Sequence, residues 1–405
     1  MASITDETDP PFRLSMLIYD TRYRSLTIQV VALIGFMLGI GWLVSNAAAN
    51  LAALGKPLSF SFLWNPAGYD INQRLIEYNS QMSHGRAAVV GLLNTLLVAV
   101  MGCILATVLG VFIGVARLSK NWLIARIMTI YVEMFRNVPV LLWIVFAMAI
   151  FIETLPQPRA FRGENPEASM LLWDSVALTN RGFYIPSPIF GGGSLIVVAV
   201  FFLSLVGIWY YRRMAKAKQR ATGEQSPVFW VGLGLFFVPA ILAQLVLGNP
   251  ITLEYPELKG FNFQGGFYMR NSLIALWLAL SFYTAAFIAE IVRAGIMSVS
   301  KGQTEAAGAL GLRPNRTMSL VILPQALRVI IPPLISNYLN LTKNSSLAIA
   351  VGYMDITGTL GGITLNQTGR EMETLLMLML CYLIISLSVS AVMNWYNNSI
   401  KLKER

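Results

Sequence analysis

The sequence has few charged side chains, a single histidine and only two cysteines. Charged residues make up 12% of the chain, about half the proportion usual for a soluble domain, which excludes an ordinary soluble globular protein. Cys103 and Cys381 both fall within long apolar segments, so the sequence predicts no disulfide framework. We interpret the lone His84, in the polar stretch NSQMSHGRA, as a solvated residue, and the sequence predicts no metal site.

Two classes of nucleotide chemistry are also excluded. The phosphate-binding pattern G-x-x-x-x-G-K-[ST] is missing, so the chain cannot hydrolyse ATP through a P-loop. The formal net charge of +10 does not indicate nucleic-acid binding. The excess of Lys and Arg lies in loops beside apolar segments, where anionic lipid headgroups attract it.

The chain is rich in apolar residues. They make up 56% of it, and the mean hydropathy is +0.61. A segment of about 19 apolar residues, long enough to cross roughly 30 Å of hydrocarbon, can be placed about eight times. We therefore predict an all-α polytopic membrane protein with about eight transmembrane helices, of which the fifth is interrupted by Pro239. The predicted spans are residues 27–45, 88–117, 122–152, 194–212, 228–247, 271–297, 331–352 and 374–396.

The distribution of Lys and Arg predicts the orientation. They concentrate in the segments on one side of the predicted spans, and the densest group is Arg212, Arg213, Lys216, Lys218 and Arg220. The positive-inside rule then puts both termini in the cytoplasm. The polar head before the first span has no small-residue cleavage site behind it, so we interpret that span as a retained signal anchor.

A short polar and apolar stretch, EAAGALGLRPNRTMSLVILPQALR at 305–328, lies on the cytoplasmic side of this topology. Its first part predicts a helix with Thr304 as cap and Gly311 at its end. Its second part predicts a helix from 315 to 323 that Pro324 ends. Such a hairpin presents Ala and Gly surfaces that suit docking against another protein. A connector that packs only on its own bundle is the alternative.

The spacing Glu305-Ala306-Ala307, then Gly311, Val321 and Leu323-Pro324 resembles the EAA loop of ABC importer permeases. The segments NTLLVAVMGCILATVLGVFIGVARLS, YVEMFRNVPVLLWIVF and LPQALRVIIPPLISNYLNLTKNSSLAIAVGYMDI resemble the permeases of polar amino acid uptake systems. The family commonly has Arg-Gly-Thr-Pro where this chain has Arg136-Asn137-Val138-Pro139. The extra spans look most like the larger, Q-type permease of the general L-amino acid transporter, and the glutamate, glutamine, aspartate and asparagine system is an alternative.

This resemblance implies a multi-pass permease of the bacterial inner membrane, working by alternating access. It implies several partners: an ATP-binding ABC subunit, a second and non-identical permease, a periplasmic binding protein and an L-amino acid substrate, besides membrane lipid. The chain itself is then no enzyme and holds no cofactor, since ATP and Mg²⁺ belong to the partner ATPase. The residues expected to couple to that ATPase are Glu305, Ala306, Ala307, Gly308, Gly311, Leu323 and Pro324.

The resemblance also divides the chain into a permease core and additions to it. The core is expected in two parts, 88–152 and 271–397, the second of which contains the coupling loop at 300–328. The remaining parts are a cytoplasmic segment 1–26, an extra span 27–45, a periplasmic segment 46–87, an insertion 153–270 with periplasmic loops and two extra spans, and a cytoplasmic tail 398–405.

Ionisable side chains within spans are costly and are therefore candidates for the substrate pathway. Glu133 and Arg136, like Glu290 and Arg293, are three residues apart and can meet on one helix face. Lys343 has no partner at helical spacing and lies among hydroxyls and amides. Cations would bind the carboxylate of an amino acid, and acceptors would bind its ammonium group. The candidates are Glu133, Arg136, Asn137, Lys343, Asn344, Ser345 and Ser346.

Other readings of these residues stay open. The pairs could be purely structural, and the polar run around Lys343 could be a network between two permeases. We expect Pro139 and the pair Pro332 and Pro333 to break helices at membrane depth. An ion-coupled secondary transporter is the alternative function, although the sequence shows no inverted repeat. A membrane enzyme would need a nucleophile or metal constellation that the spans lack.

Overall fold

The computed structural model describes residues 15–163 and 165–400. Within these residues eight helices are long and apolar enough to cross a membrane, as predicted. They cover Tyr23–Ala53, His84–Ala116, Val140–Phe161, Ser194–Thr222, Val228–Val246, Asn271–Met297, Pro314–Val351 and Glu371–Asn397. Residues 1–14 of the expected N-terminal segment and 401–405 of the expected tail lie outside the described residues.

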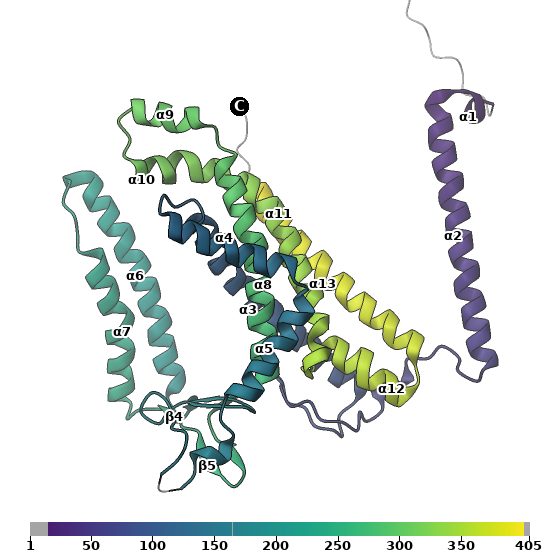
Figure 1. The fold of residues 1–405 in the computed structure, drawn as a ribbon, viewed down its shortest axis with the longest axis horizontal. Coiled ribbons are helices and arrows are strands. Elements are labelled where there is room, and N and C mark those ends of the chain that lie inside the picture. Colours follow the sequence, from purple (N-terminus) through teal and green to yellow (C-terminus); the bar gives the residue numbers. More distant parts are fainter. Residues whose placement is uncertain (1–14, 164, 401–405) are drawn as a thin grey trace, which may run out of the picture.

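The core is a bundle built around one central helix, α8 (Asn271–Met297). It packs against α3 (His84–Ala116), α5 (Val140–Thr154) and α11 (Leu323–Asn344), and α11 in turn packs on α13 (Glu371–Ile400). In Figure 1 these helices form the middle of the molecule. In the most apolar stretch of α8, 72% of the residues are buried. Other parts of the protein therefore surround most of this helix.

Glycines allow α3 and α8 to approach closely. A Cβ atom on Gly110 would lie 2.6 Å from Cβ of Ile288, and one on Gly114 would lie 2.7 Å from the backbone oxygen of Ala289. Both distances are shorter than van der Waals contact, so only glycine fits at these positions. Packing without a strong hydrophobic drive favours such small residues between membrane helices. The two helices therefore form one tightly joined pair.

The predicted third span is two helices. Asn121 caps α4 (Trp122–Asn137) by accepting hydrogen bonds from the backbone N–H groups of Leu123 and Ile124. The chain then leaves the helix at Val138, which is extended with φ −109° and ψ 132°, before α5 begins. Pro139 disfavours helical backbone at the residue before it. The expected break is confirmed, and a single helix over 122–152 is wrong.

The other prolines do not break their helices. Pro332 and Pro333 lie inside α11, and Pro239 lies inside α7 (Val228–Val246). The prediction of a break at 332–333 was therefore wrong. Ile331 and Ile335 are buried on either side of the pair. This packing outweighs the loss of two backbone hydrogen bonds, as happens at many prolines in membrane helices.

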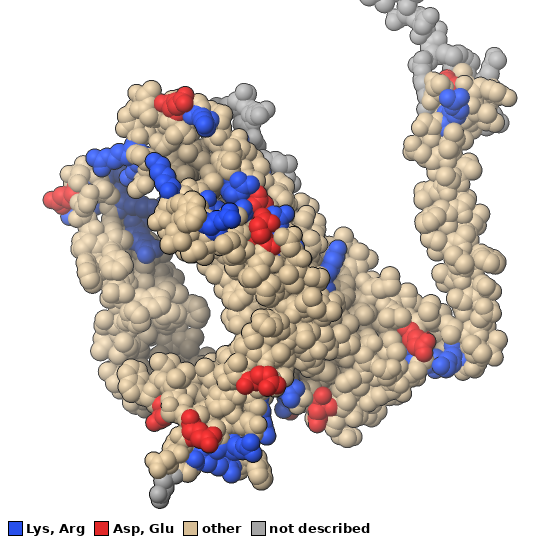
Figure 2. Space-filling model, in the orientation of Figure 1, with Lys and Arg blue, Asp and Glu red and all other residues tan. Residues whose placement is uncertain are grey.

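Three helices stand apart from the bundle. In Figure 1 α2 (Thr21–Ala53), which follows the short α1 (Met16–Tyr19), lies away from the other helices. The hairpin of α6 (Ser194–Thr222) and α7 lies on the opposite side. Figure 2 shows an open gap between this hairpin and the bundle. These helices belong to the predicted extra spans.

Short strands connect the hairpin to the bundle within the expected insertion. Strand β2 (Gly182–Ile185) pairs antiparallel with β1 (Ala177–Thr179) and β7 (Phe267–Arg270), with Gly182 opposite Arg270. Because β7 runs directly into α8, this sheet lies on the start of the central helix. Two further antiparallel pairs are β3 (Ser187–Phe190) with β4 (Ile251–Glu254), and β5 (Glu257–Lys259) with β6 (Asn262–Gln264).

His84 is buried, contrary to the prediction that it is solvated. Its side chain is 4% exposed, and its Nδ1 lies 3.1 Å from Oγ1 of Thr364. The rings of Phe62 and Tyr69 lie against it. The segment before α3 folds back over the first turn of that helix, which no local pattern in NSQMSHGRA indicates. The short elements on this side are η1 (Ser61–Trp64), η5 (Thr357–Thr364) and α12 (Leu365–Thr368), and η2 (Pro158–Phe161) lies in the insertion.

Candidate functional site

The predicted coupling hairpin lies at one end of the bundle (Figure 1). Its first helix is α9 (Lys301–Ala309), in which only Ala307 is buried and Glu305, Ala306 and Gly308 are exposed. A Cβ atom on Gly308 would meet nothing within 4 Å. The surface of α9 is thus formed by small side chains with free space above them.

Of the two predicted ends of α9, the structure confirms only the C-terminal one. Gly311 ends the helix as predicted, with φ +76°, and Leu312 N–H donates to the carbonyl of Ala307 at 3.1 Å. A left-handed residue after a helix is the usual role of glycine there. Ser300, and not Thr304, is the residue before the first turn. The predicted cap was wrong because the helix begins one turn earlier.

The second half of the hairpin continues into the membrane. It runs from α10 (Pro314–Thr317) through the π-helical turn η3 (Met318–Ile322) into α11 without a stop. Pro324 therefore lies in the first turn of α11 and does not end a helix, which corrects the prediction. In the π turn before it, N–H groups bond to carbonyls five residues back, as Leu323 N–H does to Met318, so the helix passes Pro324, which has no N–H, without a break. Leu323 and Pro324 are exposed.

A three-residue charge cluster joins α3 to α8 near this end. The predicted pair of Glu290 and Arg293 is confirmed, with Nη2 of Arg293 2.5 Å from Oε1 of Glu290. Arg117 at the end of α3 donates to the other carboxylate oxygen, and its side chain is only 9% exposed. Sequence spacing could not indicate Arg117, because it lies on another helix 173 residues away. Figure 2 shows Lys and Arg side chains gathered at this end.

The predicted pair of Glu133 and Arg136 is not formed. The guanidinium of Arg136 lies over the ring of Phe287, 5.5 Å from its centre. Glu133 instead accepts a hydrogen bond from Nδ2 of Asn137 at 3.4 Å. These side chains lie exposed at the end of α4, and Glu133 and Asn137 line a cleft of about 500 Å³ on that helix.

Lys343 and its polar neighbours lie where α11 passes into η4 (Ser345–Val351). The hydroxyl of Ser345 donates to the carbonyl of Thr342, and that of Ser346 to the carbonyl of Lys343. Ser345 is buried and Lys343 is exposed. Arg136 contacts the ring of Phe287, and within the described part of the chain no ion pair involves Lys343. The exposed ammonium group of Lys343 thus has no counter-charge among these residues.

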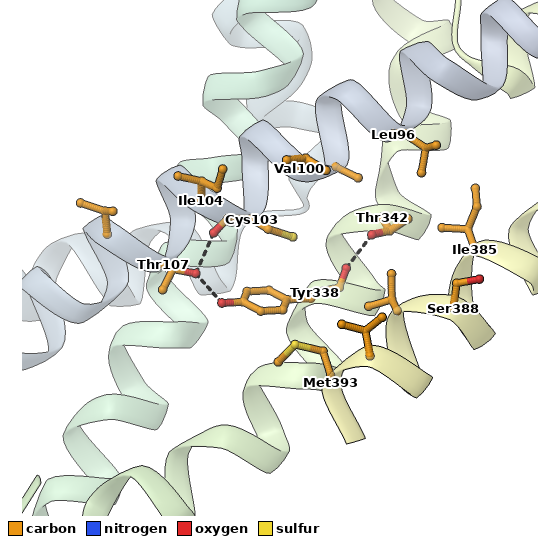
Figure 3. A pocket seen from close by; sticks show the side chains of 14 residues that line it. Leu96, Val100, Cys103, Ile104, Thr107, Tyr338, Thr342, Ile385, Ser388 and Met393 are labelled. Atoms are coloured by element: carbon orange, nitrogen blue, oxygen red, sulfur yellow. Dashed lines mark hydrogen bonds between the residues drawn. The ribbon is translucent and has the colours of Figure 1, made fainter. Parts of the chain in front are cut away.

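A groove of about 630 Å³ between α3, α11 and α13 is almost entirely apolar (Figure 3). Its polar groups bond to one another: Oγ1 of Thr107 lies 2.7 Å from the hydroxyl of Tyr338, and Thr342 donates to the carbonyl of Tyr338. No Lys, Arg, Asp or Glu lines it. It therefore offers no counter-charge to the ammonium or carboxylate of an amino acid.

Sequence reasoning missed a buried carboxyl group after η4. Asp355 is 0% exposed, accepts from Gly358 N–H at 2.8 Å, and accepts from the Tyr382 hydroxyl at 3.3 Å. Burial raises the pKa of Asp355 to about 6, although these hydrogen bonds oppose the rise. Asp355 lies three residues after the predicted seventh span, and only ionisable residues within the spans were predicted as candidates.

The chain is similar to known membrane transport proteins. The family described as binding-protein-dependent transport system inner membrane component matches residues 222–402. The chain is 58% identical to the glutamate/glutamine/aspartate/asparagine transport system permease protein of Rhodobacter capsulatus, over 98% of this chain and 99% of that protein. It is 45% identical to the general L-amino acid transport system permease protein of Rhizobium johnstonii, over 97% and 96%. A crystal structure of an amino acid ABC transporter with histidines aligns over 78% of this chain and 95% of that chain, with 18% identity and a TM-score of 0.44.

Proposed function

The chain belongs to the permeases of binding-protein-dependent amino acid ABC importers, and we propose that it is one of two non-identical permease subunits that import polar L-amino acids across the bacterial inner membrane. Near-complete alignment to a permease of this kind at 58% identity is the observation that supports the proposal best. A periplasmic binding protein would deliver the substrate, and the two permeases would expose their pathway alternately to each side.

The energy would come from a partner ATPase that docks on α9. The exposed residues Glu305, Ala306 and Gly308 and the sharp turn at Gly311 support this role, because small side chains allow close approach of another protein. ATP and Mg²⁺ would bind to that partner, since this chain has no P-loop. Leu323 and Pro324 would support the base of the hairpin, where Gln325 donates to Gln303 at 3.3 Å.

We further propose that α9 and both termini lie in the cytoplasm. In Figure 1 α1, α9 and the end of α13 lie at the same end of the molecule, and the basic run at the end of α6 agrees with a cytoplasmic position. The core would then be 88–152 with 271–397, and α2, α6 and α7 would be additions.

The substrate pathway would pass the exposed ends of α4 and α11. Arg136 and Lys343 would attract the carboxylate, while Glu133, Asn137 and the polar run 344–346 would supply acceptors. The second permease would form the other side of this pathway.

The test is uptake of labelled L-amino acids into proteoliposomes that hold this chain with its co-purifying subunits. Uptake should require ATP and the binding protein, and Gly311→Asp should abolish it without loss of subunits. Gly223→Asp is the matched control, since Gly223 also ends a helix with φ +76° and open space around its Cβ position. It should transport normally. Uptake driven by an ion gradient without ATP would refute the proposal.

A further inference from the structure

A polar pocket lies at the opposite end of α8 from α9. Its volume is about 490 Å³, and it opens where the strands of the insertion meet the bundle. Since α8 has 27 residues, the pocket is about 40 Å from the coupling hairpin. The lining residues come from α5, the strands, the start of α8 and the end of η4: Met148, Arg181, Asn262, Tyr268, Arg270, Asn271, Ser272, Val351 and Gly352.

Two guanidinium groups give the pocket a positive charge. Arg181 donates to the carbonyl of Phe261 at 3.2 Å, and its own carbonyl accepts from the hydroxyl of Tyr268 at 2.9 Å. Arg270 is half-buried at the end of β7. Within the described residues neither side chain forms an ion pair, and no carboxylate lines the pocket. The pocket is thus a place where an anion would gain two planar, charged donors.

The start of α8 adds to this charge. Arg270 is the residue before its first turn, and no side chain caps the free backbone N–H groups there. The first helical N–H groups and the helix dipole favour an anion at such an end.

One buried side chain at this point still lacks a partner. Asn271 is 1% exposed; its Nδ2 donates to the carbonyl of Thr179 at 3.2 Å, but its Oδ1 accepts nothing from the protein. This oxygen is itself buried in the wall of the pocket, so the groups that face a ligand are the donors of Arg181, Arg270 and the start of α8. The pocket therefore offers donors for carboxylates.

We propose that this pocket is a binding site for an L-amino acid that carries two carboxylates. Arg181 and Arg270 bind one carboxylate each, and the free N–H groups of α8 support the carboxylate next to Arg270. The pocket receives the substrate before it reaches the spans, a role that rests on the proposed import function. Val351 of the pocket lies at the end of η4, which directly follows Lys343 in the chain. Met148 of the pocket lies in α5, which follows Arg136 in the chain.

Binding of labelled L-glutamate to the purified complex in nanodiscs, without ATP or binding protein, tests this site. Arg270→Gln should weaken binding at least about tenfold, as expected for loss of a charged hydrogen bond, and Arg270→Lys should weaken it less. Arg181→Gln should also weaken binding, and its exposed position keeps it informative if Arg270→Gln does not assemble. Arg159→Gln is the control, since Arg159 is an exposed arginine of the insertion that does not line the pocket. L-Leucine should compete poorly.

Equal binding by the wild type, Arg270→Gln and Arg181→Gln would overturn the proposal. So would unchanged glutamate binding together with weaker stimulation of the ATPase by the binding protein, because the arginines would then contact that protein. Failure of the import function has a different signature, namely no uptake by the wild type with ATP and binding protein present. The binding assay needs neither component, so the two failures are distinguishable.

Discussion

The buried carboxyl of Asp355 makes the stability of the folded chain depend on pH. Its pKa is raised from 3.8 to about 6 by burial, so the folded state favours the protonated form. The stabilisation is fully present below about pH 4 and is lost as the pH rises through about 6. A shift of about two pKa units corresponds to about 3 kcal/mol. At neutral pH the ionised group therefore destabilises the fold by roughly this amount relative to low pH.

Asp355→Asn should remove this dependence. Its Oδ1 can still accept from Gly358 N–H, and its Nδ2 can donate to the Tyr382 hydroxyl, which also lies 3.1 Å from Oγ1 of Thr357. The variant thus keeps the hydrogen bonds without burying a charge. At pH 7.5 we expect it to unfold about 5 °C higher than the wild type, and at pH 4.5 at nearly the same temperature.

The assay is thermal unfolding in detergent at several pH values between 4.5 and 7.5. Asp70→Asn is the control, because Asp70 is exposed and its replacement removes a carboxyl without touching the buried one. A wild-type midpoint that does not fall over this range, or an Asp355→Asn curve that runs parallel to the wild type, would show that the buried group does not control stability.

Three other predictions follow from packing and charge. Gly114→Val should destabilise the bundle by at least about 2 kcal/mol, because its side chain would collide with the backbone of α8; Gly207→Val, with nothing within 4 Å, should be neutral in the same thermal assay. Glu290→Gln should cost about 2 kcal/mol, since it leaves the nearly buried Arg117 without its counter-charge, and an unchanged unfolding midpoint would contradict this. Lys343→Ala should abolish uptake with assembly intact, and surviving transport would remove this residue from the proposed pathway.

Features with a local or periodic signal could be predicted from the sequence. Long apolar runs indicated the eight spans, because crossing hydrocarbon requires length and hydropathy alone. Gly311 marked the end of α9 because a left-handed residue there favours glycine. Glu290 and Arg293 could be paired because they lie three residues apart on one helix.

Features that depend on tertiary contacts could not be predicted. Arg117 meets Glu290 only through the packing of α3 on α8. His84 is covered by Phe62 and Tyr69 and also bonds to Thr364, which is 280 positions away. Pro332 and Pro333 have the local pattern of a break, but neighbouring helices hold α11 together. Arg136 has a carboxylate at helical spacing and yet lies over Phe287 instead. In each case the deciding partner is remote in the sequence.

The close packing of α3 against α8 has a consequence for how the central helix can move. The close approach of α3 to α8 at Gly110 and Gly114 favours tilting of the two helices as one unit. A tilt of about 10° over the roughly 40 Å of α8 moves one end by about 7 Å relative to the other. If the proposed partner ATPase moves α9, such a tilt would carry the movement along α8 towards the pocket at its other end.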